Sequence, residues 1–225
     1  MNYHWDFGVI VAYYPALING LINTIRLSAV CFIAGLSIGL FFGVLRTTPT
    51  RILRLIGTCY VEMFRNVPSL ILLVWFYYAI PAATGWQLSI WIAATVALSL
   101  YSGAYSAEIY RAGIESIDKG QWEAARALGF GYLGQLRYAI LPQAIPKMIP
   151  AFTNRGIELV KSTTLASMLA YPDLLYQARI IGESEYRPLE AYTAVAVLFT
   201  AFLLPMTYLS LWIEKRIKEK SSNDK

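Results

Sequence analysis

The chain has 225 residues, of which 57% are hydrophobic and 15% are charged, and its formal net charge is +5. Soluble domains usually have about 25% charged residues. The shortfall, together with apolar runs of ~20 residues, places the chain among membrane proteins. The positive residues lie in short segments between apolar runs, where they set membrane orientation, and they form no basic groove with interleaved aromatics. We therefore expect no nucleic-acid binding.

The residue types that metal sites and acid–base catalysis use most are scarce. His4 is the single histidine, and Cys31 and Cys59 lie in or beside apolar runs without metal-ligand or disulfide spacing. The sequence also has no phosphate-binding loop ending in Gly-Lys-Ser/Thr. We expect no metal, no bound cofactor and no enzyme activity in this chain, although a carboxylate-based intramembrane enzyme is a distant alternative. No basic segment precedes the first apolar stretch, so we expect no cleavable signal peptide.

Apolar length predicts five membrane spans in a single transmembrane domain, residues 1–225. The first span contains 19 uncharged residues, 27–45, and Gly35, Gly39 and Gly43 form a small-residue seam on one of its faces. Between Arg65 and Glu108 lie 42 uncharged residues, enough for two crossings. The fold class is thus an all-α membrane protein, with spans expected at residues 20–45, 56–78, 88–110, 145–168 and 191–213.

Lysine and arginine counts predict the orientation. The segments after the first and third spans and the C-terminal tail are rich in these residues, whereas the N-terminus and the loop at residues 79–88 have none. Because positive residues favour the cytoplasmic side, the N-terminus is expected outside and the C-terminus in the cytoplasm. An odd number of spans is required, and five agrees.

A short polar segment between the third and fourth spans is predicted to form a helix at residues 119–128. Asp118 and Gln121 have the spacing of a capping box, and Gly129 is suited to the left-handed conformation that ends a helix. At roughly 15 Å this helix is too short to cross a bilayer. Its local pattern fits an ordinary surface helix equally well, but the topology places it in the cytoplasm.

This segment resembles the EAA loop of ATP-binding-cassette importer permeases, in which a short coupling helix docks into a groove of the ATPase subunit. The position usually held by isoleucine is Ala139 here, a minor departure at a packing position. The resemblance implies that ATPase coupling is carried by Glu123, Ala124, Ala125, Gly129, Leu141 and Pro142.

Other segments narrow the resemblance to polar amino-acid uptake permeases. They are residues 60–68, 107–114, 141–144 and 159–165, while Trp5-Asp6 and residues 43–65 most resemble glutamate/aspartate permeases. The resemblance implies an inner-membrane importer with a second permease chain, identical or paralogous. It also implies two ATPase subunits that hold ATP and Mg, and an extracytoplasmic amino-acid-binding protein.

The fourth span carries charges that a bilayer does not tolerate alone. Each charge at the bilayer centre costs about 2.5–3.5 kcal/mol. Arg155, Glu158, Lys161 and Ser162 fall on one helix face. The cations suit an α-carboxylate and Glu158 suits an ammonium group, so we expect a substrate site; alternatively, Glu158 and Lys161 pair only with each other. Related permeases for basic amino acids often have an aspartate where this chain has Ser162, so its neutral hydroxyl favours an acidic or neutral polar substrate.

Hydroxyls on the third span are further candidates for substrate binding. Ser99, Ser102, Tyr105 and Ser106 lie there, although hydrogen bonds that pack helices together are the commoner use of such residues.

Two pairs near the cytoplasmic ends, Glu62 with Arg65 and Glu108 with Arg111, are interpreted as structural pairs or gate elements.

Together these features predict a permease subunit of an ATP-driven importer of glutamate or aspartate. The alternatives are the same type of importer for glutamine or a basic amino acid, and, from another class, an ion-coupled secondary carrier or channel.

Overall fold

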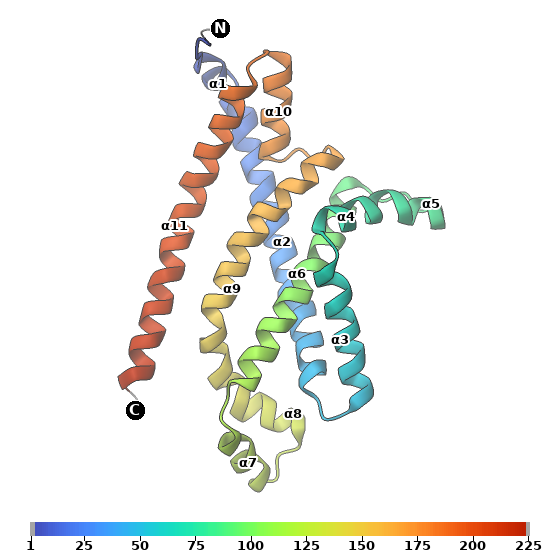
Figure 1. The fold of residues 1–225 in the computed structure, drawn as a ribbon, viewed down its shortest axis with the longest axis vertical. Helices are drawn as coiled ribbons and strands as arrows, with labels where there is room; N and C mark the ends of the chain where they lie inside the picture. The colour runs from blue at the N-terminus through green and yellow to red at the C-terminus, as the bar shows by residue number, and fades with distance from the viewer. Residues whose placement is uncertain (1–2, 224–225) are drawn as a thin grey trace. The chain divides into compact units, whose positions relative to one another are not determined.

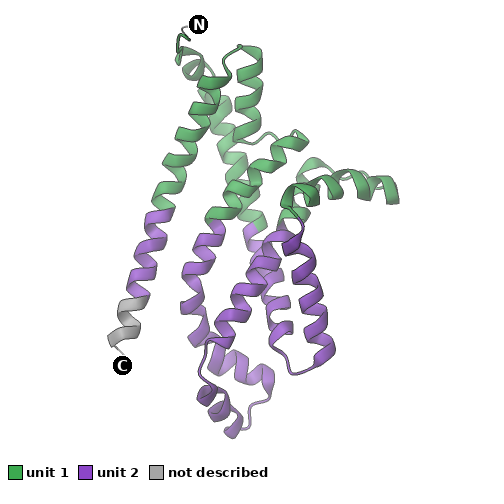
Figure 2. Ribbon diagram, viewed as in Figure 1, with its two compact units in different colours: residues 1–31, 68–98, 157–206 green, residues 32–67, 99–156, 207–225 purple. Residues whose placement is uncertain are grey.

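The computed structural model describes residues 3–223, with side chains described for residues 3–217. Every regular element in that part of the chain is helical (Figure 1). The chain divides into two compact units, coloured separately in Figure 2. Unit 1 contains residues 1–31, 68–98 and 157–206, and unit 2 contains residues 32–67, 99–156 and 207–225. The tail residue Lys225, which entered the orientation prediction, lies outside the described residues, as do the side chains beyond residue 217.

Besides the α-helices, the described residues form two π-helical segments and one 3₁₀-helical segment. In chain order the elements are α1 (Gly8–Ala12), α2 (Tyr14–Thr47), α3 (Arg51–Asn66), α4 (Ser69–Val74), π-helical η1 (Trp75–Ala79), α5 (Ile80–Thr84), α6 (Ile90–Glu115), α7 (Lys119–Ala127), α8 (Tyr132–Gly134), π-helical η2 (Gln135–Ile140), α9 (Leu141–Thr163), 3₁₀-helical η3 (Thr164–Leu169), α10 (Leu174–Ser184) and α11 (Pro188–Asn223).

Three helices in the described part of the chain are long and apolar enough to cross a membrane: α2, α6, and α11 over residues 188–217. Helix α2 contains the span predicted at residues 20–45, α11 contains the one at 191–213, and α6 covers all but the first two residues of the one at 88–110. The number rises to four if α3 and the helical segment Ser69–Thr84 count as one broken span. Length and composition therefore support three to four of the five predicted crossings.

The predicted second span, residues 56–78, is interrupted rather than continuous. Helix α3 ends at Asn66, and Val67 has the extended dihedrals φ −89° and ψ 128°. Pro68 follows and α4 begins at Ser69. Proline has no backbone N–H and disfavours helical dihedrals in the residue before it, so the helix breaks at this position.

The predicted fourth span, residues 145–168, contains most of α9 and all of η3 except its last residue. It is not among the helices that are apolar enough to cross a membrane by composition. Arg155, Glu158 and Lys161 lower its hydropathy, and Pro146 and Pro150 lie inside the helix.

Unit 1 has a core formed by α2, α10 and α11 and a buried carboxylate at the start of α11. The core residues are Leu17, Leu174, Ala178, Ile181, Ala191 and Val195. Glu190 accepts hydrogen bonds from the Tyr3 hydroxyl and from the backbone N–H of Asp6, the latter at 3.0 Å, and pairs with Arg187 at 3.3 Å. These contacts fix the N-terminal segment against the start of α11, since breaking them would leave a buried charge without compensation.

In unit 2, the predicted glycine seam is a close contact between α2 and α6. A Cβ atom at Gly39 would lie 2.4 Å from the Cβ of Ser106, and one at Gly43 would lie 2.7 Å from the Cβ of Tyr110. Real Cβ atoms do not approach other heavy atoms this closely, so only glycine permits the two helices to pack at this distance.

Replacing Gly39 with alanine should therefore destabilise the protein. The added methyl group would also lie 2.9 Å from the backbone nitrogen of Ala107, which cannot move away without shifting α6. Overpacking of this kind costs about 1–3 kcal/mol. The measurement is the melting temperature in detergent. The control is Gly131→Ala, where nothing lies within 4 Å of the added atom; equal melting temperatures for the two variants would contradict the seam.

A second prediction concerns Asp173, the N-cap of α10 in unit 1. Its Oδ1 accepts from the backbone N–H of Tyr176 at 2.7 Å, whereas Oδ2 is buried without a hydrogen-bond partner among the described residues. Burial raises the pKa of this carboxyl from 3.8 to about 7. The folded protein thus holds the extra proton between about pH 4 and pH 7, and the free energy of unfolding should fall as the pH rises through that range.

Asp173→Asn keeps the capping oxygen but cannot ionise, so it should remove this part of the pH dependence. Melting temperatures at pH 5 and pH 8 in detergent measure the effect. An unchanged difference between the two pH values in the variant would show that Asp173 does not cause it.

Candidate functional site

The predicted short helix is α7, and its two ends are closed by the residues expected to close them. The Asp118 side chain accepts from the backbone N–H of Gly120 at 2.7 Å. Gly129 has φ +81°, its N–H donates to the carbonyl of Arg126 at 2.9 Å, and Phe130 N–H donates to the carbonyl of Ala125 at 3.2 Å. This pair of bonds is the Schellman arrangement, which satisfies carbonyls that the helix leaves unpaired.

Gln121, the second residue of the predicted capping box, has a different partner from the one expected. The side-chain oxygen of Gln121 accepts a hydrogen bond from Gln143 at 3.0 Å. The amide that was expected to close the N-terminus of α7 therefore ties α7 to the start of α9 in unit 2.

Helix α7 rests on a hydrophobic cluster within unit 2. Trp122 packs against a cluster formed by Ile114, Ile117, Leu136, Ile140, Ala144 and Met148. Its ring also stacks on that of Tyr132, with centroids 6.1 Å apart. This packing fixes which face of α7 points away from the unit.

The outward face of α7 carries charged and small side chains and is flanked by apolar residues. Glu123, Ala124, Arg126 and Ala127 are exposed, while Ala125 is only 4% exposed. Ala125 therefore packs inward and cannot meet a partner as a surface residue, unlike Ala124.

Beyond α7, the side chains of Leu128 and Leu133 are 77% and 71% exposed. Leu141 is half-buried and packs against the cluster below α7, whereas Pro142 is exposed. Two large apolar side chains therefore lie exposed next to α7.

Glu108 on α6 is the centre of an ionic cluster in unit 2. It pairs with Arg46 and with Arg111, and Arg65 lies 3.5 Å away; Arg111 also pairs with Glu115. The predicted Glu108–Arg111 pair is present. Sequence reasoning assigned Arg46 to a loop that sets orientation, but it lies in the last turn of α2 and its side chain is 11% exposed.

The predicted partner of Arg65 differs from the one observed. Glu62 accepts hydrogen bonds from the Asn66 side chain, one of them to Oε2 at 3.0 Å, and Arg65 turns to Glu108.

Arg155, the first of the predicted site residues on α9, is 4% exposed and lies against two aromatic rings of α6 in unit 2. Its Cζ is 4.2 Å from the ring centroid of Tyr105 and 4.8 Å from that of Tyr101. Their spacing of four residues places both tyrosines on one helix face. The sequence contained that spacing, but nothing in it identified the cation that the rings contact.

Glu158, Lys161 and Ser162 lie further along α9, in unit 1. Glu158 and Lys161 are exposed, and Ser162 is half-buried. The Ser162 hydroxyl donates to the backbone carbonyl of Glu158 at 3.0 Å. The Ser162 hydroxyl is therefore hydrogen-bonded within its own helix.

The serines predicted on the third span are buried in α6. Ser99 and Ser102 are 5% and 0% exposed, and Ser106 is 0% exposed. A Cβ at Gly35 would lie 2.6 Å from the Ser102 hydroxyl. Ser102 and Ser106 therefore border the glycine seam. The hydroxyls of Ser99, Ser102 and Ser106 have no hydrogen-bond partner among the described residues, so the helix-packing hydrogen bonds weighed for them are not seen.

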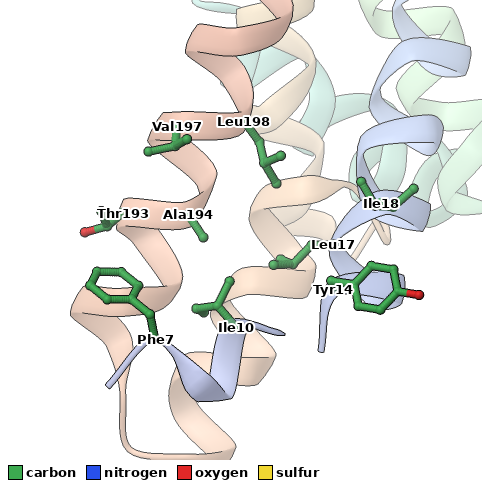
Figure 3. Close-up of a pocket in the computed structure, with 9 residues that line it drawn as sticks. All are labelled: Phe7, Ile10, Tyr14, Leu17, Ile18, Thr193, Ala194, Val197 and Leu198. Atoms are coloured by element: carbon green, nitrogen blue, oxygen red, sulfur yellow. The ribbon is translucent and has the colours of Figure 1, made fainter. Parts of the chain in front are cut away.

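An apolar cavity of about 310 Å³ lies in unit 1 beside α1, α2 and α11. Figure 3 shows the side chains that line it, with the hydroxyl oxygens of Tyr14 and Thr193 pointing away from the apolar groups. A polar amino acid needs charged or hydrogen-bonding partners, so this cavity is unsuited to such a substrate.

The Schellman end of α7 is open to a direct test. Gly129→Ala should lower the melting temperature modestly, because an L-residue in the left-handed conformation costs about 1–2 kcal/mol. Nothing lies within 4 Å of the added methyl group, so the cost comes from the backbone alone. Gly129→Asn, which tolerates that conformation better, should recover part of the loss; a larger loss for Asn than for Ala would contradict the assignment.

Residues 35–219 match the family described as "Binding-protein-dependent transport system inner membrane component". The chain is 36% identical over 201 residues to the "Probable glutamine ABC transporter permease protein GlnM" of Bacillus subtilis (strain 168), with 89% of this chain and 93% of that protein covered. It is 33% identical over 219 residues to the "Arginine transport system permease protein ArtQ" of the same organism, with 97% and 99% covered.

Among solved structures, the chain is similar to one described as an "amino acid ABC transporter with histidines". The TM-score is 0.87 at 34% identity, and the similarity covers 95% of this chain and 100% of that one. A structure of the MetNI methionine ABC transporter has the same fold, with a TM-score of 0.76 at 24% identity over 92% of this chain and 98% of that one.

These comparisons support the predicted resemblance to amino-acid uptake permeases. They do not support the narrower prediction of a glutamate/aspartate permease. The two relatives above are named as glutamine and arginine permeases, so they give no support to a glutamate/aspartate permease. With a match over residues 35–219 and relatives above 30% identity along nearly its whole length, the chain belongs to the family of binding-protein-dependent transport system inner membrane components, and its relatives are amino-acid ABC transporter permeases.

Proposed function

We propose that the chain is the permease subunit of an ATP-driven importer that carries a neutral polar amino acid of the glutamine type into the cytoplasm. The observation that carries the ATP-driven part of this proposal is α7, a helix capped at both ends, with an exposed glutamate and exposed alanines on its outward face. A helix of this kind between two membrane spans is suited to transmit a motion from a partner, because its contact with the core keeps it from moving independently.

The permease acts within a larger assembly. A second permease chain completes the pathway, two ATPase subunits bind ATP and Mg, and an extracytoplasmic protein delivers the amino acid. Glu123 and Ala124 meet a groove on an ATPase subunit, together with Gly129, Leu141 and Pro142. Ala125 supports that surface from below, since it is buried.

The chain crosses the inner membrane five times, with the N-terminus outside and the C-terminus in the cytoplasm. The broken pair of helices on either side of Pro68 makes the second crossing, and α9 makes the fourth. The charges of α9 are tolerated there because they face the pathway and their partners instead of lipid.

The substrate assignment combines the relatives with the charges of α9. Arg155 and Lys161 suit an α-carboxylate and Glu158 suits an ammonium group, so a zwitterion is matched at both ends. The neutral Ser162 adds no charge for a cationic side chain, and a relative named as a glutamine permease agrees with a neutral cargo.

A basic amino acid is the second candidate cargo. One relative is named as an arginine permease, and the carboxylate of Glu158 is exposed on α9.

An importer without an ATPase, driven by an ion gradient, would leave α7 without a task.

Glu123→Ala should uncouple transport from ATP hydrolysis without removing the protein from the membrane. Loss of one anchor at a protein interface, roughly 1.4 kcal/mol, corresponds to an about tenfold loss of ATP-dependent uptake. The measurement is uptake in proteoliposomes that contain the complete complex, with permease content checked by immunoblot. Glu183→Ala removes an exposed carboxylate from α10 and serves as the control; equal uptake by both variants would argue against the coupling role.

Competition experiments test the cargo. Uptake of labelled glutamine by the reconstituted complex should be inhibited most strongly by unlabelled glutamine, and less by arginine, glutamate or aspartate. Strong inhibition by arginine alone would favour the second candidate, and strong inhibition by glutamate and aspartate would restore the acidic cargo.

A further inference from the structure

The ring of Tyr105 in unit 2 lies within cation–π distance of two arginines that come from different helices. The Cζ of Arg155, from α9, is 4.2 Å from its centroid, and the Cζ of Arg65, from α3, is 5.2 Å from it. Both distances are within the range of cation–π attraction, which strengthens where water is excluded. Arg155 is 4% exposed, so its contact belongs to the stronger kind.

The two arginines differ in what else they contact. Arg65 lies 3.5 Å from Glu108, the centre of the ionic cluster with Arg46 and Arg111. Arg155 is held by a second ring, that of Tyr101, at 4.8 Å. Tyr105 therefore connects the ionic cluster to the most deeply buried cation of the predicted substrate site.

Arginine is well suited to such a site because its guanidinium stacks on aromatic faces and is more weakly hydrated than an ammonium group. A long side chain has many rotamers, however, and a substrate carboxylate would have to order it at a cost in binding free energy. A ring that holds the guanidinium before the substrate arrives removes part of that cost.

We propose that Tyr105 is a positioning residue that holds the Arg155 guanidinium ready for the substrate carboxylate and ties it to the Glu108 cluster through Arg65. The inference rests on the proposed function, since it gives Arg155 the carboxylate of the cargo. Tyr105 acts through Arg155 and does not itself need to touch the substrate.

The first test is the KM for glutamine uptake by the complete complex in proteoliposomes. Tyr105→Met keeps a large apolar side chain without a ring face and should raise KM about tenfold, which corresponds to about 1.4 kcal/mol of ordering cost that the ring no longer removes. Tyr105→Phe keeps the ring and should leave KM within about twofold of the wild type. Tyr110→Met is the matched control, because this ring on the same helix packs against Phe152; its KM should not change.

A KM for Tyr105→Met equal to that of Tyr105→Phe would overturn the proposal. Arg65→Gln provides a second readout that leaves Tyr105 and Arg155 in place. It should raise KM by about threefold, and an unchanged KM would refute the connection to the ionic cluster.

A stability cycle tests the contact independently of the cargo. Melting temperatures are compared for Tyr105→Met, Arg155→Gln and the double variant in the purified complex. The loss in the double variant is expected to be smaller than the sum of the two single losses, because either single change already removes the contact between Tyr105 and Arg155. Additive effects would overturn the contact itself. If the wild-type complex takes up no amino acid with ATP, the proposed function fails while this cycle still decides whether Tyr105 holds Arg155.

Discussion

The structure depends on how a mostly apolar chain compensates its buried charges. Glu108 is surrounded by three arginines from three helices, Arg155 lies against two tyrosine rings, and Glu190 is held by Tyr3, Asp6 and Arg187. A buried charge without such partners costs several kcal/mol. Each cluster therefore fixes the helices that supply it, and the positions of the functional groups follow from these ionic and aromatic contacts as much as from apolar packing.

Much of the fold could be predicted from the sequence because its signals are local or periodic. Apolar length located α2, α6 and α11, and the spacing of Gly35, Gly39 and Gly43 identified the close contact with α6. Asp118 and Gly129 marked the ends of α7 because a cap and a left-handed residue are requirements of a few adjacent residues. The break at Pro68 was missed, although proline is a local signal, because the apolar run continued across it.

The candidate site could be predicted only in part. The charges of α9 stand out in any hydropathy pattern, but the two rings that contact Arg155 come from another helix. Nothing in the sequence pairs Arg65 with Glu108 in place of Glu62, or Arg155 with Tyr101 and Tyr105, since these contacts depend on tertiary packing. The inward position of Ala125 likewise depends on which face of α7 rests on the core. The preference for glutamate and aspartate was argued from few residues, and the relatives do not support it.

The central claim is that this permease takes up its substrate at the expense of ATP hydrolysed by a partner subunit. The most direct measurement is uptake by proteoliposomes that contain the permease with its ATPase, with the binding protein outside and ATP either enclosed or absent. The account predicts that uptake requires enclosed ATP and continues when ionophores abolish proton and sodium gradients. Uptake driven by an imposed ion gradient without ATP would contradict it and identify an ion-coupled carrier.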